Sequence, residues 1–405
     1  MQSKPLLWTL MASAVLMMTG LGVATADKRR AAVVETCNVA SGWLEPASAK
    51  SKSLAANKVL ANAAEREFVL LGEQHDDADH HRWQLQTLAG LYAYRPDMVI
   101  GFEMFPRRLQ PVLDRWIEGK LTVREFLTQA EWDTVWSFPP ELYLPLFEFA
   151  RINRIPMVAL NVERSLTKAI GEKGWDNVPA AERAGLSRPA PPLPAYRDIL
   201  SSIYREHMPS PRRAAGKPAR ADKAFEAFVD AQLTWDRAMA EGLANRAVAD
   251  KNGNKPLLVG IMGSGHLRYG HGVPHQLRAL GFNQIATLLP RSEDMACDDL
   301  ESGLADAVFT LPVAAKVAPQ PPRLGVALED AEGSVRVQSI TAGSLAERSG
   351  FAVGDRLIEV AGSPPGNTWS VISIIRRQPP GTWLPLRVQR GETALDLVVR
   401  FPAKT

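Results

Sequence analysis

The chain has 405 residues, of which 46% are hydrophobic and 22% are charged, and its formal net charge at pH 7 is +3. This length and composition are typical of globular proteins and allow two or more hydrophobic cores. The small net charge, and the lack of a basic segment interleaved with aromatic residues, argue against nucleic acid as a partner.

The N-terminus has the pattern of a secretory signal peptide. Lys4 precedes an uncharged, mostly apolar stretch that ends with the small residues Ala24-Thr25-Ala26. This ending predicts cleavage before Asp27, so we expect residues 1–26 to be removed and the mature chain to be exported. An uncleaved anchor helix is the alternative, because about twenty apolar residues can cross a bilayer.

The chain has two cysteines. Cys37 lies in a predicted N-terminal extension, residues 27–62, and Cys297 follows the last predicted strand of the first domain. The two can form a disulfide in an oxidising compartment, and the sequence leaves both a disulfide and two free thiols open. The absence of a Cys-x-x-Cys-His motif excludes covalently attached haem.

Two Gly-x-x-His motifs stand nearly two hundred residues apart, and each follows a short apolar run. Gly72-Glu73-Gln74-His75 follows residues 68–71, and Gly263-Ser264-Gly265-His266 follows residues 256–262. Short apolar runs that end in glycine are typical of buried parallel strands entering loops. Two imidazoles placed alike predict one shared site.

Two further apolar runs, residues 98–102 and 155–160, end in Glu103 and Asn161. Helical patterns lie between the runs. This alternation predicts an α/β domain over residues 63–295, with a mostly parallel sheet and flanking helices.

The predicted helices cover residues 107–118, 121–129, 140–152 and 222–250. Another helix is expected after the first motif, where Asp76, Asp77 and Asp79 suit capping of its N-terminus. The adjacent His80 and His81 point about 100° apart on a helix, so at most one of them faces the site. The proline-rich residues 189–213 predict an insertion or lid without regular helix.

The strand ends predict a ligand site. Ligands of parallel sheets bind beyond the carboxyl ends of the strands, so we expect convergence of His75, Glu103, Asn161 and His266. Neutral imidazole can bind zinc or haem iron, and a nearby carboxylate can orient it or act as a general base. The sequence has no His-Glu-x-x-His pair, so a metal site would have to be assembled from separate strands.

The paired motifs, the segment Gly101-Phe102-Glu103-Met104, the Leu160-Asn161 strand end and residues 231–240 resemble the ChaN family of the Tiki superfamily. The resemblance covers residues 63–291. It implies a haem-binding protein associated with iron uptake, located in the periplasm or cell envelope, and a homodimer is possible. The superfamily also includes Tiki-type metalloproteases and erythromycin-esterase-like hydrolases.

The resemblance also implies particular site residues. ChaN-type haem binding involves a tyrosine ligand, and the candidates are Tyr143, Tyr196, Tyr204 and Tyr269, of which Tyr269 is closest to a motif. The expected cofactor site comprises Gly72, Glu73, His75, Glu103, Asn161, Gly263, His266, Tyr269 and His271, with His75 and His266 as metal ligands. In a hydrolase, the catalytic residues would be His75, Glu103 and His266, with zinc or another divalent metal.

Residues 296–322 predict a proline-rich linker, and residues 323–402 resemble a PDZ domain of the kind that accompanies bacterial proteases. The resemblance rests on the segments Ser344-Leu345-Ala346-Glu347 and Gly354-Asp355-Arg356-Leu357 and on a helix near residues 369–377. It implies a small β-rich fold that binds a peptide's C-terminal carboxylate. The expected peptide-binding residues are Leu324, Gly325, Val326 and Ile372, and packing within the chain is the alternative role.

Three functions compete. The paired motifs and the export pattern favour an exported haem- or iron-binding protein whose PDZ module binds peptide or protein C-termini. A Tiki-type metal-dependent hydrolase or protease is the first alternative. The second is a non-catalytic envelope scaffold that acts through its PDZ domain.

Overall fold

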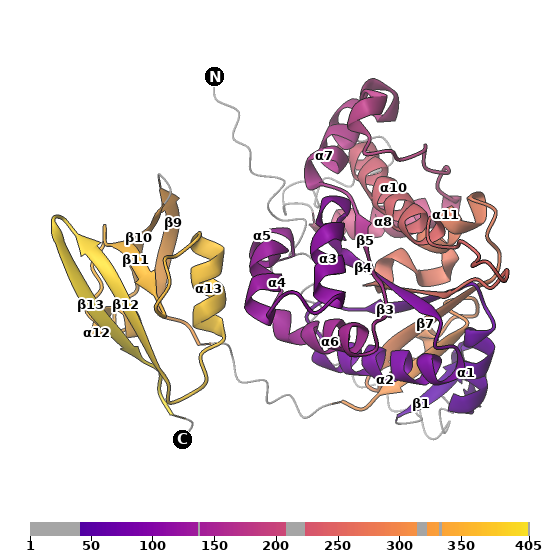
Figure 1. Cartoon of the computed structure of the whole chain (residues 1–405), viewed down its shortest axis with the longest axis horizontal. Coiled ribbons are helices and arrows are strands. Elements are labelled where there is room, and N and C mark those ends of the chain that lie inside the picture. Colours follow the sequence, from indigo (N-terminus) through magenta and orange to yellow (C-terminus); the bar gives the residue numbers. More distant parts are fainter. Residues whose placement is uncertain (1–40, 137, 208–222, 314–321, 332–333, 404–405) are drawn as a thin grey trace, which may run out of the picture. The chain divides into compact units, whose positions relative to one another are not determined.

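The computed structural model describes residues 41–403 apart from 137, 208–222, 314–321 and 332–333 (Figure 1). The predicted signal peptide and Cys37 lie outside the described residues. The described residues up to 130 and from 140 to 313 form one compact unit, and those at 131–139 and after 313 form the second. Among the described helices, none is both long enough and apolar enough to cross a membrane.

The first unit is built on an eight-stranded sheet in the order β2-β1-β8-β7-β3-β6-β4-β5. Every pairing among β3 to β8 is parallel, whereas β1 is antiparallel to both β8 and β2. The predicted fold class is confirmed. The strands are β1 (Gly42–Glu45), β2 (Lys52–Leu54), β3 (Phe68–Glu73), β4 (Met98–Pro106), β5 (Met157–Asn161), β6 (Leu257–Gly263), β7 (Ile285–Ser292) and β8 (Ala307–Leu311).

The sheet extends further than the sequence predicted. Strands β1 and β2 come from the predicted N-terminal extension, and β8 comes from the predicted linker. The Trp43 ring lies 5.8 Å from the Trp83 ring and 5.2 Å from the Phe309 ring between centroids, which anchors this edge. Strands of three to five residues contain too few apolar positions for their period to be recognised.

Helices cover both faces of the sheet, with α1, α2 and α6 along one side and α7, α8, α10 and α11 along the other (Figure 1). The α-helices are α1 (Ala56–Ala64), α2 (Ala78–Tyr94), α3 (Gln110–Ile117), α4 (Val123–Gln129), α5 (Trp132–Val135), α6 (Leu144–Ile152), α7 (Arg164–Lys173), α8 (Pro194–His207), α10 (Lys223–Ala244) and α11 (Val273–Ala279). Short 3-10 helices are η1 (Ser48–Lys50), η2 (Arg107–Leu109), η3 (Pro140–Leu142), η4 (Trp175–Asn177), η5 (Ala180–Glu182), η7 (Ser264–His266), η8 (Arg268–Gly270) and η9 (Cys297–Asp299).

The prediction of a helix-free insertion at residues 189–213 was wrong, because α8 begins within it. The prolines at 189–192 precede the helix, and Pro194 is its first residue. Proline suits that position, since the first N–H groups of a helix have no partner within it. The density of prolines therefore marked the start of a helix.

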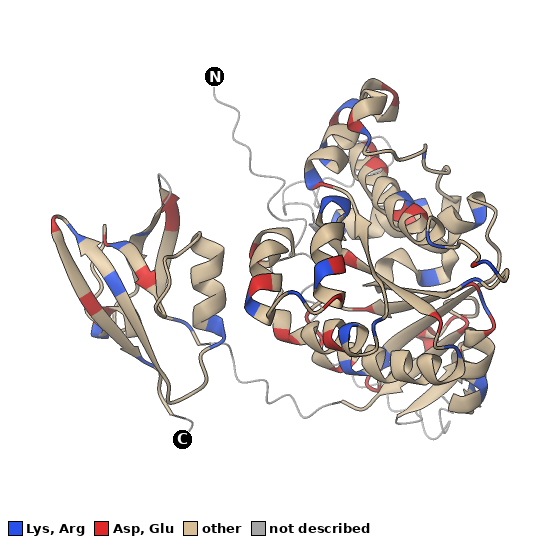
Figure 2. Cartoon of the chain, viewed as in Figure 1, with Lys and Arg blue, Asp and Glu red and all other residues tan. Residues whose placement is uncertain are grey.

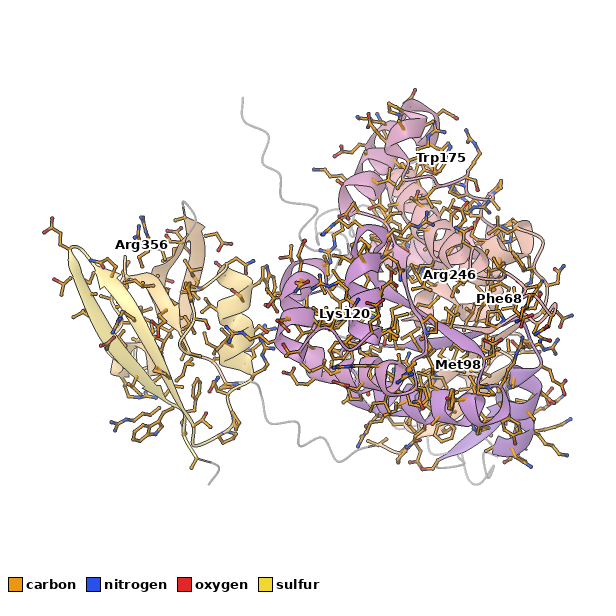
Figure 3. All side chains as sticks on the ribbon, in the orientation of Figure 1. Phe68, Met98, Lys120, Trp175, Arg246 and Arg356 are labelled. Carbon is orange, nitrogen blue, oxygen red and sulfur yellow. The ribbon has the colours of Figure 1, made fainter. Side chains whose placement is uncertain are left out.

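The central strands explain why the sheet is stable. All residues of β3 and β6 are buried, and Phe68 is fully covered in the side-chain packing (Figure 3). Continuous apolar strands of this kind require helices on both faces. Acidic and basic side chains are interspersed over both units, in keeping with the small net charge (Figure 2).

The main part of the second unit is a five-stranded antiparallel sheet in the order β13-β12-β11-β10-β9, accompanied by α12 and α13. The core includes Val335, Leu357, Val371 and Val388. The predicted β-rich fold and the helix near residues 369–377 are confirmed. The elements are β9 (Val326–Ala331), β10 (Ser334–Ile340), α12 (Leu345–Arg348), β11 (Arg356–Val360), α13 (Thr368–Arg376), β12 (Trp383–Arg390) and β13 (Thr393–Arg400).

Candidate functional site

The carboxyl ends of β3, β4 and β6 lie side by side in the middle of the first sheet. Glu73 pairs with Gly263 across β3 and β6, and Phe102 pairs with Ile261 across β4 and β6. This parallel register brings together the side chains that follow each strand. We call the resulting group of ionisable residues the strand-end cluster; it comprises Glu73, His75, His81, Glu103, Asp236 and His266.

Glu73 is the centre of the first half of the cluster. Its Oε1 lies 2.6 Å from His75 Nδ1, and its Oε2 lies 2.9 Å from His81 Nδ1. The Tyr143 hydroxyl is 3.1 Å from Glu73 Oε1 and equally far from the His75 carbonyl oxygen, so it can donate to either. Burial raises the pKa of Glu73, but the hydrogen bonds from the two histidines outweigh it and lower the pKa from 4.5 to about 2.

His266 is the centre of the second half. Its Nδ1 lies 2.6 Å from Asp236 Oδ1, and its Nε2 lies 3.5 Å from Glu103 Oε1. The Tyr196 hydroxyl donates to Asp236 Oδ2 at 2.8 Å, and the Gly263 amide donates to Glu103 Oε2 at 2.7 Å. Burial lowers the pKa of His266, but the charges of Glu103 and Asp236 outweigh it and raise the pKa to about 10.

The two halves meet at Gly263 and Glu103. A Cβ atom on Gly263 would lie 3.0 Å from His75 Cε1 and 3.7 Å from Glu103 Oε2, so glycine allows this close approach. Burial lowers the pKa of His75, but its hydrogen bond to Glu73 and the charges of Glu73 and Glu103 raise it overall. Two carboxylates therefore favour the cationic form of each imidazole, and His266, whose pKa is about 10, keeps its proton at neutral pH.

Cationic imidazole has no lone pair for a metal or for haem iron. The described residues also contain no group of three or more His, Cys, Asp or Glu side chains arranged to hold a metal ion. The strand-end cluster is a set of paired charges, and the expected ligand role of His266 would need the loss of its proton. The side chains of His75 and His266 remain 15% and 13% exposed, so both are within reach of solvent.

Other expected site residues have supporting roles. The Asn161 side chain donates to the Glu103 carbonyl oxygen at 3.1 Å and accepts from the Val162 amide at 2.8 Å, so it joins β4 to the end of β5. A Cβ on Gly72 would lie 2.4 Å from Leu289 Cδ2, so this glycine permits close packing below the cluster. Neither residue belongs to the strand-end cluster.

The loop after β6 brings Tyr269 and His271 together at the same edge. Tyr269 has φ of 57°, and its ring stacks on that of His271 with 5.7 Å between centroids. Its hydroxyl donates to Glu301 Oε2 at 3.0 Å. Burial and then Glu301 raise the pKa of Tyr269, whereas burial and the neighbouring His275 and Arg278 lower the pKa of His271.

Among the other tyrosine candidates, Tyr143 and Tyr196 are buried, and their hydroxyls bind carboxylates of the strand-end cluster. Tyr204 packs against Phe225 and Phe228. Only Tyr269, of these four, is both partly exposed and next to a histidine that is neutral at pH 7.

Sequence reasoning missed Asp236 and undervalued His81. Asp236 lies on α10, within the stretch that carried the family resemblance, but nothing in its spacing shows that it reaches His266. The helix geometry correctly limited the His80–His81 pair to one member, because His81 binds Glu73 while His80 Nδ1 accepts from the Gln74 amide. The capping interpretation of Asp77 is also confirmed, since its side chain accepts from two amides of α2.

In the second unit, the predicted peptide-binding loop lies between Leu324 and β9. Gly325 has φ of 74°, and a Cβ there would lie 2.4 Å from Ser344 Cβ, so only glycine fits. The carbonyl groups of Leu324 and Gly325 accept from the Ala346 and Thr341 amides, both at 2.8 Å, which fixes the shape of the loop.

Comparison with known families agrees with this architecture. Residues 59–277 match the family described as haem-binding uptake, Tiki superfamily, ChaN, and this span is more than half of the chain. The chain belongs to the ChaN family. Haem is the ligand that defines this family. Residues 322–400 match the PDZ domain family.

Several solved structures are similar. A ChaN structure from Campylobacter jejuni with cofacial haem has a TM-score of 0.49 and 16% identity, over 66% of this chain and 96% of that chain. The HtrA3 PDZ domain with a phage-derived ligand has a TM-score of 0.18 and 20% identity, over 19% and 82%. A serine endoprotease from Yersinia pestis has a TM-score of 0.18 and 18% identity, over 20% and 29%. No curated protein matches the chain.

The charge pairs of the ChaN-like domain predict a pH dependence of stability. The pKa of His266 is about 10 in the folded protein against an ordinary 6.5, so its stabilising contribution is complete below about pH 6.5 and is lost as the pH rises toward 10. Replacing Asp236→Asn removes one of the two charges that raise this pKa. We expect the free energy of unfolding of the variant to fall less than that of the native chain between pH 6.5 and 10.

Urea denaturation of both chains at each pH checks this prediction, since the PDZ unit contributes equally to both. Asp176→Asn is the control, because its side chain is 75% exposed. An identical pH slope in the Asp236→Asn variant would contradict the assigned pairing.

Proposed function

We propose that this chain binds haem at the loop after β6, with the Tyr269 phenol as the iron ligand, as part of iron uptake. Membership of the ChaN family supports haem as the cofactor. The observation that carries the choice of residues is the stacked pair of Tyr269 and His271 at the strand-end edge.

Three features of the loop fit a haem. A tyrosine in the left-handed region is uncommon, and such strained residues cluster at functional sites. The lowered pKa of His271 favours neutral imidazole, which has one nitrogen lone pair available, and its buried Nδ1 has no hydrogen-bond partner among the described residues. The exposed Arg268 and Arg278 offer positive charge for the haem propionates.

Bound haem would supply ferric iron, which phenolate oxygen can ligate. The chain's residues supply the rest. Tyr269 presents its oxygen once the proton shared with Glu301 is released, and His271 lies against the phenol ring. Within the strand-end cluster, His266 keeps its proton at neutral pH. Its pairing with Asp236 and Glu103 holds the loop after β6 in place.

A haemin titration of the mature chain, followed at the Soret band, tests this proposal. We expect saturation near one haem per chain, or two if a homodimer stacks haems. Because Tyr269→Phe removes only the ligating oxygen, it should weaken haemin binding by about 10-fold or more.

Tyr94→Phe is the matched control, because Tyr94 is exposed and lies at the end of α2, far from Tyr269 in the sequence. His75→Gln and His266→Gln test the sequence-based ligand assignment. If those two variants lose the Soret shift and Tyr269→Phe retains it, the iron ligands are the histidines and not Tyr269. No saturable shift in the native chain would contradict haem binding altogether.

We also propose that the chain is exported to the periplasm or cell envelope. The signal-peptide pattern supports export, and Cys297 is disulfide-bonded, as is typical of oxidising compartments. Edman sequencing of protein recovered from the envelope fraction should give a mature N-terminus at Asp27. Protein that keeps Met1 and stays in the cytoplasmic fraction would contradict the proposal.

A second candidate is hydrolysis at the strand-end cluster, with zinc or another divalent metal as the possible cofactor. The two carboxylate–histidine pairs favour it, because each carboxylate fixes the orientation of one imidazole, as general acid–base catalysis requires. The raised pKa of His266 keeps the proton at pH 7, so a base at this position works better in alkali.

For this candidate we expect hydrolysis of fluorogenic ester or peptide substrates to increase with pH above 7, with or without added Zn²⁺. His75→Gln and His266→Gln should each abolish hydrolysis, because each imidazole either carries the transferred proton or orients the group that carries it. Turnover that persists in both variants, or a rate independent of pH, would contradict a catalytic role.

The PDZ unit supports a third element of the proposal, namely capture of a peptide or protein C-terminus. The fixed Leu324-Gly325 loop and the edge strand β9 are the parts of the unit that this mode of recognition uses.

A further inference from the structure

A cavity lies beside the edge strand β5, where η2 and the end of α10 contact it. Its volume is about 330 Å³, and its lining includes Val158 and Ala159 of β5 and Gly242 of α10. This volume is in the range of sites for small molecules. No lining residue belongs to the strand-end cluster or to the loop after β6, so the lining of this cavity is distinct from both.

The Gln110 side chain closes the outer side of β5. This strand ends the sheet, so among the described residues no further strand pairs with it. Gln110 Oε1 accepts from the Ala159 amide at 2.9 Å, and its Nε2 donates to the Met157 carbonyl oxygen at 2.8 Å. Its Nε2 also donates to Asp114 Oδ1 at 2.8 Å, so both of its protons are used. Gln110 therefore forms a wall of the cavity without offering a donor to a ligand.

Arg107, the first residue of η2, brings a largely buried positive charge to the cavity. It donates to the Ala238 carbonyl oxygen at 3.0 Å and to the Ala184 carbonyl oxygen at 3.3 Å, and these bonds use two of its five N–H groups. Glu241 Oε2 lies 3.7 Å from Arg107 Nη2. Burial outweighs this pairing and lowers the pKa of Arg107, so its charge is only partly compensated.

Glu241 does not balance the arginines around it. Its Oε1 accepts from Arg237 Nε at 2.9 Å and from the Ser187 backbone amide at 3.0 Å, so two guanidinium groups share this one carboxylate. Arg246, in the turn after α10, also lines the cavity, and it forms no ion pair with a described residue (Figure 3). The cavity therefore has an excess of positive charge, which favours an anion.

We propose that this cavity binds a small dicarboxylate, with one carboxylate on Arg107 and the other on Arg246. A planar guanidinium group binds a carboxylate through two parallel N–H···O bonds, so each arginine can hold one end of such a ligand. The Asn245 side chain lines the cavity, forms no hydrogen bond with a described residue and supplies a further donor. The uncharged lining from β5 and α10 suits the short carbon chain between the carboxylates.

Isothermal titration calorimetry of the mature chain with succinate, acetate and inorganic phosphate tests this inference. We expect one succinate per chain, bound about 10-fold or more tightly than acetate, because acetate can use only one of the two arginines. Succinate should also bind more tightly than phosphate, because phosphate leaves the uncharged part of the lining in water.

Two variants locate the site. Arg246→Gln removes one guanidinium group and should weaken succinate binding about 10-fold. Arg246 is exposed and outside the buried network of Glu241, so this substitution leaves the packing intact, whereas a change at Arg107 would also break its bonds to two carbonyl groups. Arg336→Gln is the matched control, because Arg336 is exposed on the PDZ unit and its loss changes the net charge equally. It should leave the affinity unchanged.

The outcomes are distinct from those of the haemin titration. No saturable succinate binding to the native chain, or equal succinate affinity of the native chain and Arg246→Gln, overturns the site. Tighter binding of phosphate than of succinate overturns the assignment of a dicarboxylate. Weaker haemin binding by Arg246→Gln would assign the cavity to the haem propionates and overturn a separate site.

Discussion

The ChaN-like domain depends on the compensation of buried charge at one edge of its sheet. The Glu73 side chain is fully covered at the end of the central strand, where an isolated carboxylate would be strongly destabilising. His75 and Tyr143 hydrogen-bond to its Oε1, and His81 forms an ion pair with its Oε2. The loop after β3, the first turn of α2 and the region before α6 are held in their places by this one requirement.

The same requirement explains why the motif histidines and the proposed haem ligand are different residues. His266 is held between two carboxylates and keeps its proton, whereas burial, His275 and Arg278 lower the pKa of His271. An imidazole that stabilises buried carboxylates as a cation is poorly suited to iron. An imidazole that burial keeps neutral, stacked on a partly exposed phenol, has the properties that a haem site needs. Charge pairing thus provides the scaffold, and the loop beyond it carries the proposed haem ligand.

The PDZ unit presents a different kind of surface. Its sheet ends at β9, which is paired on only one side within the sheet, and the hydrogen bonds between Asp330 and Thr368 hold the start of α13 against this strand.

The sequence by itself determined the α/β class, the PDZ unit, strands β3 to β6 and the convergence of His75, Glu103 and His266, because apolar runs and glycine-ended motifs are local patterns that parallel strands turn into neighbours. It could not show that Asp236 pairs with His266, that His81 as well as His75 pairs with Glu73, or that β1, β2 and β8 complete the sheet. Those features depend on contacts between segments far apart in the chain, and the protonation of the histidines follows from burial and neighbouring charge. Such properties belong to the folded environment of a residue, and only the tertiary structure decided them.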